Sequence, residues 1–274
     1  MEHEHAGNST PLVIGEADEL MRPATRRQFV QMMGAGGAIL MMPGVFSACA
    51  TTPVPGMGTS GGLMFDLRSD VGIFRLVHTL EQLEAAFYTA VVASPSFTTF
   101  FNGAEQELFT DLRNVEIVHR EFVRTALGSQ AVPDVRGTIN GATLATILSS
   151  RENILAASRL FEHLGVSALN GAGKYLQDAR NLLLAGKFVS VEARHVAALR
   201  DVAPPAGQNA NTAFAGDDIV DQNGMDVKLE AGAALDRAAA TRIVQDGALS
   251  SRNIIFAPTS RQGKPSADFF PTTP

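Results

Sequence analysis

Two Glu-x-x-His motifs are the residues of this chain best suited to carry chemistry. They are Glu116–His119 and Glu192–His195, and each lies in an apolar segment with helical periodicity. Because residues three apart project from one face of a helix, each motif directs a carboxylate and an imidazole toward one point. Such ligands without sulfur favour iron or manganese over copper(I) or structural zinc. A third motif, Glu2–His5, lies in the N-terminal leader, so a single match is weak evidence.

Further polar residues fall on faces that the apolar pattern predicts to be buried. Glu81, Glu84 and Tyr88 share one seam of a helical segment, and Glu162 lies among leucines in a later one. Each of these segments precedes one that carries Glu-x-x-His. The chain therefore contains the same half-motif twice, as two helical hairpins that each supply Glu plus Glu-x-x-His.

The cost of burying charge supports a metal site. One unpaired buried carboxylate costs several kcal/mol, and four or more together repel one another. No Lys or Arg is evident on the same faces, so two divalent cations are the expected compensation. For any one residue, a solvent-exposed position on a helix is the stronger interpretation. The set as a whole favours two iron or manganese ions bound in the core.

These residues need long helices to position them. Apolar periodicity predicts helices over 70–93, 104–127, 142–175 (with a break near Ser149 and Ser150) and 178–202. Helices of this length suit a four-helix bundle. The sequence thus predicts an all-α fold, with the bundle over 67–203.

The C-terminal extension, 204–274, has a weaker pattern. Pro204 and Pro205 close the last bundle helix, and a polar stretch follows. We expect a helix over 225–246, where Ala and Leu are dense. The apolar residues at 254–256 and 269–270 could dock on the bundle.

The N-terminal segment is typical of an export signal. Arg26 and Arg27 precede a Gly-rich apolar stretch, and no charged residue occurs between Arg27 and Asp66. This order resembles a twin-arginine signal, which exports folded proteins, and predicts a signal peptide over 1–48. An ordinary secretory signal with two chance arginines is the alternative. Either one implies export to the periplasm or cell envelope.

Cys49 is the single cysteine of the chain and follows small residues. This resembles a bacterial lipobox, although Phe46 stands where Leu is usual. Lipidation of Cys49 would tether the protein to a membrane without a transmembrane helix, and 49–66 would form a flexible tether. Cleavage after a nearby Ala, which leaves a soluble secreted protein, is the alternative.

Composition excludes several classes of protein. The 274 residues carry a formal net charge of −6 and no basic stripe, which argues against nucleic-acid binding. One cysteine excludes an intramolecular disulfide framework and a Cys-rich metal cluster.

The arrangement of carboxylates and histidines resembles the ferritin-like di-metal proteins, which place one Glu on each of two helices and Glu-x-x-His on the other two. The strings Leu80–Tyr88, Phe161–Ser167 and Val191–Arg200 are similar to exported bacterial and plant desiccation-related ferritin-like proteins. The resemblance covers about 67–203 and not the extension.

This resemblance implies roles for the individual residues. Glu116 and Glu192 would bridge two metal ions, His119 and His195 would each bind one, and Glu162 would be a terminal ligand. The helix-one ligand is Glu81 or Glu84, and the resemblance favours Glu81 because Tyr88 follows it by seven residues. The other acid would then be a neighbouring partner or a seventh ligand. His78 and His163 are expected to lie at the periphery.

The resemblance also implies a function, a dinuclear iron or manganese centre with redox chemistry toward peroxide, oxygen or metal ions. A non-enzymatic stress or desiccation-related envelope protein is the alternative. An interaction module that acts through the extension is a third. Metal ions are the expected partners, and a homo-oligomer is compatible with the sequence.

Overall fold

The computed structural model describes residues 63–257. The predicted signal with Arg26 and Arg27, the proposed lipidation site Cys49 and most of the expected tether lie outside the described residues, as do Phe269 and Phe270. None of the helices in the described part is long and apolar enough to cross a membrane.

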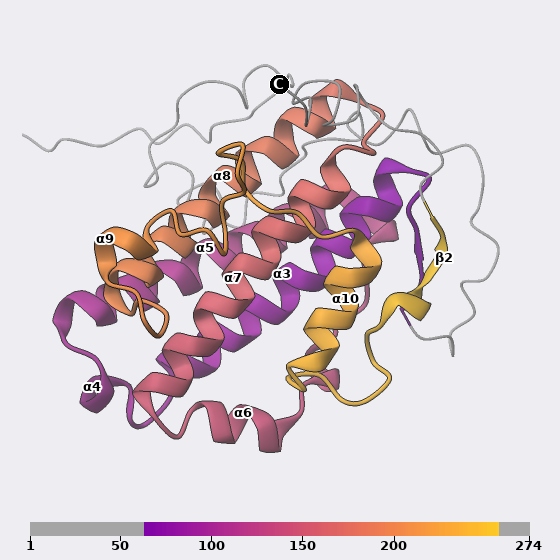
Figure 1. Cartoon of the computed structure of the whole chain (residues 1–274). Coiled ribbons are helices and arrows are strands. Elements are labelled where there is room, and N and C mark those ends of the chain that lie inside the picture. The colour runs from indigo at the N-terminus through magenta and orange to yellow at the C-terminus, as the bar shows by residue number, and fades with distance from the viewer. Residues whose placement is uncertain (1–62, 258–274) are drawn as a thin grey trace, which may run out of the picture.

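Four long helices form the body of the described structure (Figure 1). They are α3 (Asp70–Val92), α5 (Gly103–Leu127), α7 (Arg151–Gly173) and α8 (Ala179–Val202). Their ends lie within two residues of the predicted ones, and the break before α7 is present. The prediction of an all-α bundle is confirmed.

Each long helix begins at a side chain that caps its free backbone N–H groups. Ser69 accepts a hydrogen bond from the Gly72 N–H, and Ser150 and Asp178 cap α7 and α8 in the same way. Asn102 and Glu105 form a reciprocal capping box at the start of α5. Such caps contribute about 1 kcal/mol each and fix where the helices start.

The long helices form two hairpins. α3 packs mainly against α5, and α7 packs mainly against α8. The short helix α4 (Phe97–Phe100) lies in the first hairpin. The two hairpins are joined by η3 (Gly128–Gln130), η4 (Arg136–Thr138) and α6 (Gly141–Ile147).

The C-terminal extension folds back onto the bundle. It contains α9 (Ala210–Ala213), α10 (Ala231–Ala240), η5 (Ser251–Asn253) and β2 (Ile254–Phe256). α10 lies along α7 (Figure 1). β2 pairs in parallel with β1 (Phe65–Asp66), so residues 254–256 of the extension lie beside the start of the bundle.

The predicted helix over 225–246 is too long. Residues before Ala231 are not helical, because the chain runs against α7 and the Leu229 N–H donates to the Ser167 carbonyl. A Cβ on Gly171 would lie 1.7 Å from the Leu229 oxygen, so this approach requires glycine. α10 ends at Ala240, shortly before Arg242 adopts a φ of 57°. The docking of 254–256 took the form of a strand, which the sequence analysis did not predict.

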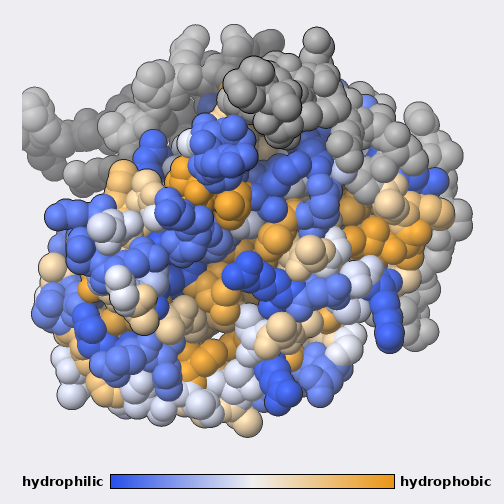
Figure 2. Space-filling view, viewed as in Figure 1, coloured by the Kyte–Doolittle hydropathy of each residue, from blue (hydrophilic) through white to orange (hydrophobic). Residues whose placement is uncertain are grey.

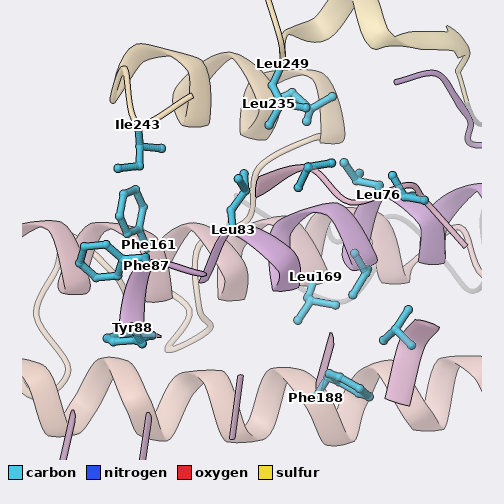
Figure 3. Close-up of a cluster of buried hydrophobic side chains, with 14 of the residues drawn as sticks. Leu76, Leu83, Phe87, Tyr88, Phe161, Leu169, Phe188, Leu235, Ile243 and Leu249 are labelled. Carbon is cyan, nitrogen blue, oxygen red and sulfur yellow. The ribbon is translucent and has the colours of Figure 1, made fainter. Parts of the chain in front are cut away.

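Apolar side chains join the extension to the bundle. Phe87 of α3 and Phe161 of α7 meet edge to face with centroids 4.9 Å apart. Figure 3 shows Ile243 of the extension beside these rings. It also shows Leu235 and Leu249, both of the extension, near each other. On the face that α7 and α10 share, hydrophobic residues remain visible between hydrophilic ones (Figure 2). The extension therefore shares the core of the bundle.

Candidate metal centre

The carboxylates and imidazoles singled out in the sequence converge in the middle of the bundle. Every long helix contributes, and the side chains are Glu81 and Glu84 from α3, Glu116 and His119 from α5, Glu162 from α7, and Glu192 and His195 from α8. Glu116, Glu162 and Glu192 are 0% exposed. This concentration of buried acids is the main polar feature of the core.

One group of potential ligands surrounds His119. Its Nδ1 atom lies 2.9 Å from Glu192 Oε1 and 3.4 Å from both Glu81 Oε2 and Glu116 Oε2. These four side chains, from α3, α5 and α8, could hold one metal ion.

A second group surrounds His195. Its Nδ1 atom lies 3.0 Å from both Glu116 Oε1 and Glu162 Oε2, and 3.7 Å from Glu192 Oε2. These four side chains, from α5, α7 and α8, could hold a second ion.

The two groups share Glu116 and Glu192. Each of these carboxylates places one oxygen near the Nδ1 of His119 and the other near the Nδ1 of His195. Glu81 faces only the first group, and Glu162 only the second. The two groups of potential ligands therefore lie next to each other and have these two carboxylates in common.

Seven of the potential ligand atoms make no hydrogen bond within the described part of the protein. Both oxygens of Glu116 and of Glu192, together with Oε2 of Glu81, Oε1 of Glu162 and Nδ1 of His119, are buried without a hydrogen bond in the described part. An unsatisfied buried polar atom costs about 1–3 kcal/mol. Seven such atoms around two points, all oxygen or imidazole nitrogen, fit two hard or borderline cations such as iron or manganese.

Ionisation in the cluster shows the same need for positive charge. Burial raises the pKa of Glu162 to about 8, although His195 opposes this shift. Burial also raises the pKa values of Glu81 and Glu84 well above the usual range. For His195, burial lowers the pKa, but Glu162, Glu116 and Glu192 outweigh burial and raise it to about 12. Burial among other acids thus favours the protonated forms of Glu81, Glu84 and Glu162.

Glu84 lies beside both groups and belongs to neither. It follows Glu81 by one helical turn, just as Gly165 follows Glu162 on α7. A Cβ on Gly165 would lie 3.1 Å from Glu84 Oε1 and 3.7 Å from Glu192 Oε2. Gly165 therefore leaves space for the Glu84 carboxylate, and the two halves of the centre differ at this position.

Tyr88 is fully buried next to the cluster. Burial and the charge of Glu162 raise the pKa of its phenol well above the usual value. Its ring packs against Phe87 at 5.1 Å between centroids. The neutral phenol thus lies beside the carboxylates, as the sequence analysis expected.

His78 and His163 belong to neither group of potential ligands. Nδ1 of His78 accepts a hydrogen bond from the Val132 N–H, and burial lowers the pKa of His78 to about 4. Burial also lowers the pKa of His163. His78 therefore holds the loop that follows α5.

The sequence analysis did not single out Gly165, which lies beside the site, or Asp70, which lies at the start of α3. Gly165 had a detectable signal, because it occupies the position after Glu162 that Glu84 occupies after Glu81. Asp70 had no such signal. It is fully buried and accepts hydrogen bonds from the backbone of Gln177 and Asp178 and from Nδ2 of Asn181.

Comparison with known proteins agrees with this geometry. Residues 69–204 match the model of a family described as "Ferritin-like domain". Searches of curated proteins and of solved structures returned no match. Residues 69–204 are thus similar to a ferritin-like domain, and the buried glutamates and histidines within them form two groups that could each hold a metal ion.

Proposed function

We propose that this ferritin-like domain binds a dinuclear iron or manganese centre and uses it for redox chemistry with dioxygen or peroxide. The observation that carries the proposal is the position of Glu116 and Glu192, whose oxygens are divided between the two histidines. His119 with Glu81 would complete one ion's ligands, and His195 with Glu162 the other's.

Two such ions would supply one-electron steps between the +2 and +3 states. The protein holds the ligands on four rigid helices, so both positions are defined before metal enters. The surrounding apolar core excludes bulk water from the cluster. Glu84 and Tyr88, which lie outside both ligand groups, would carry or hold protons beside the centre.

Metal analysis tests the proposal. The chain from residue 50 onward should be purified after reconstitution with Fe²⁺ or Mn²⁺ and compared with a Glu116→Ala/Glu192→Ala variant. About two ions per chain, lost in the variant, are expected. Next, the reduced iron form should react with dioxygen or peroxide and change its absorbance. A correctly folded chain that takes up neither metal at stoichiometric amounts would contradict the proposal.

A structural role is the second candidate, because the ligand set draws on all four long helices. Ions at these positions would then join the two hairpins without turning over a substrate. Metal-loaded protein that melts far above the metal-free form and is inert toward dioxygen and peroxide would favour this role.

We also propose that the protein is exported to the cell envelope through the segment containing Arg26 and Arg27. Cys49 would receive the lipid. Support comes from the sequence alone. An Arg26→Lys/Arg27→Lys variant should accumulate in the cytoplasm, and Cys49→Ser should shift the exported protein from the membrane to the soluble fraction. Unchanged fractionation of both variants would contradict the proposal.

A further inference from the structure

A small cavity lies where α3, α7 and the C-terminal extension meet. Its walls are Leu80 and Leu83 of α3, Phe161 and Leu164 of α7, and Ala238 and Ile243 of the extension, with Gly165 and Glu84 completing the lining. The free space is about 20 Å³. A water-sized molecule needs about 10–15 Å³ by this measure, so the cavity can hold one very small molecule.

The cavity reaches the carboxylate cluster through Glu84. Glu84 is the one polar side chain of the lining. It is 6% exposed, whereas Glu116, Glu162 and Glu192 are completely buried. Glu84 therefore separates the cavity from the potential ligands.

Gly165, which also lines the cavity, lies close to the second group of ligands. The place where its Cβ would be lies 3.7 Å from Glu192 Oε2, an atom of the second group of ligands. Any side chain at 165 would occupy the space between the cavity and this oxygen. Glycine at 165 instead leaves this space to the Glu84 carboxylate, so that Glu84 is the one side chain of the lining that lies between the apolar cavity and the second group of ligands.

From these contacts we infer that the cavity between α3, α7 and α10 admits a small uncharged reactant of the dioxygen type to the metal centre. This inference rests on the proposed function and adds the place of entry. The lining disfavours ions, because an ion would lose its hydration among leucine, isoleucine and phenylalanine side chains. A diatomic, weakly hydrated molecule loses little there.

The inference also assigns a role to the C-terminal extension. Ala238 and Ile243 form its part of the wall, and Ala238 packs with Leu80 and Leu164. The size of these two side chains sets the width of the cavity on its outer side. The extension would therefore control which reactants reach the centre.

Paired substitutions with matched controls test the inference. Ala238→Leu should fill the cavity, and its control is Ala234→Leu, one turn earlier on α10, fully buried and outside the lining. Ile243→Ala should widen the cavity, and its control is Val244→Ala, the buried neighbour that is not part of the lining. Thermal melts show which variants remain folded. If Ala238→Leu does not fold, Ile243→Ala and its control Val244→Ala test the inference instead.

Xenon is the first probe, because it is apolar, monatomic and known to enter dry cavities. Its binding to the metal-free protein, followed by ¹²⁹Xe NMR, should weaken in Ala238→Leu and strengthen in Ile243→Ala, with both controls unchanged. In the reduced iron form, oxidation by dioxygen should slow about tenfold in Ala238→Leu, which corresponds to about 1.4 kcal/mol in the barrier. It should accelerate in Ile243→Ala.

The result that overturns the inference is distinct from failure of the proposed function. Xenon binding and oxidation rates that match between each lining variant and its control would exclude the cavity as the entry, even if two metals bind. A chain that binds no metal would refute the proposed function, while the xenon titration would still report whether the cavity admits an apolar molecule.

Discussion

Glu116 on α5 and Glu192 on α8 each direct one oxygen to His119 and the other to His195. Neither acid belongs to one group of potential ligands alone. Glu81 and Glu162, in contrast, each face a single position. The centre therefore has two shared acids and two unshared ones, which makes the effects of substitution different for the two kinds.

Replacement of a shared acid should remove more metal than replacement of an unshared one. Glu116→Gln or Glu192→Gln should lower the metal content from about two ions per chain to less than one, because both positions lose a charged ligand. Glu81→Gln or Glu162→Gln should leave about one ion. Elemental analysis of the folded proteins measures this, with exposed Glu107→Gln on α5 as the control. Equal losses in all four variants would contradict the division into shared and unshared ligands.

Gly165 and Glu84 should be energetically coupled. Glycine inside a helix costs about 1 kcal/mol relative to alanine, so Gly165→Ala should stabilise a chain in which nothing opposes the new methyl group. In the unaltered chain, that group would lie 3.1 Å from Glu84 Oε1 and displace it. Gly165→Ala should therefore stabilise only the Glu84→Ala variant, with a coupling of about 1 kcal/mol or more. Denaturant unfolding of the four metal-free proteins measures this coupling, and additive effects would exclude it.

In the metal-free protein, the free energy of unfolding should decrease as pH rises. The pKa of Glu162 is about 8 in the folded protein, above the ordinary value of 4.5, so the folded state binds this proton more tightly than the unfolded state. Its contribution is complete below pH 4.5 and is lost as pH rises through 8. One such proton changes the free energy of unfolding by up to about 1.4 kcal/mol per pH unit.

The interval from pH 6.5 to 8 gives the cleanest reading, because the lowered pKa of His78 acts in the opposite direction below 6.5. Glu81, Glu84, His119 and His195 have raised pKa values and act in the same direction as Glu162. Urea unfolding at several pH values measures the slope. The slope should decrease in Glu162→Gln, and a metal-free protein that gains stability across this interval would contradict the prediction.

Asp70 should be among the most sensitive positions outside the centre. Its buried carboxylate accepts hydrogen bonds from the backbone N–H groups of Gln177 and Asp178 and from Asn181 at 2.7 Å, and so joins α3 to the start of α8. Asp70→Ala would leave the buried Asn181 amide and the two part-buried backbone N–H groups without this acceptor and should cost about 3 kcal/mol. Thermal unfolding beside the exposed Asp111→Ala measures the loss. A loss below 1 kcal/mol would mean that water replaces the carboxylate.

The extension should contribute to the stability of the bundle. Leu235 of α10 is fully buried in the core that the extension shares with the long helices. Leu235→Ala should cost about 2–5 kcal/mol in a single cooperative transition, whereas the exposed Arg237→Ala should change little. Separate unfolding of the extension, seen as a second transition, would show that it is an independent unit.

The sequence by itself determined the helices and the type of site. Ser69, Asn102, Ser150 and Asp178 mark helix starts through local hydrogen bonds, so the four long helices could be placed from short stretches of sequence. Periodicity then placed Glu116 with His119, and Glu192 with His195, on buried faces. Both features depend on local geometry, because residues three and four positions apart lie on the same face of a helix.

The conformation of the extension was harder to predict from the sequence, because it depends on the contacts that the extension makes with the bundle. Alanine-rich residues over 225–246 favour a helix, but α10 starts only at Ala231, after the chain has crossed α7 at Gly171. The pairing of β2 with β1 joins residues almost two hundred positions apart. No local pattern reports such contacts.

Only the tertiary structure divided the acids of the centre between the two groups of potential metal ligands. The helical periodicity predicted that both Glu81 and Glu84 face the core. Their spacing alone did not show which of the two is the potential metal ligand. The packing of α3 against α5 brings Glu81 within 3.4 Å of His119, while Glu84 faces the space left by Gly165 on α7. The ligand types therefore come from the sequence, and their partners come from how the two hairpins pack, since that packing sets distances of a few ångströms between helices.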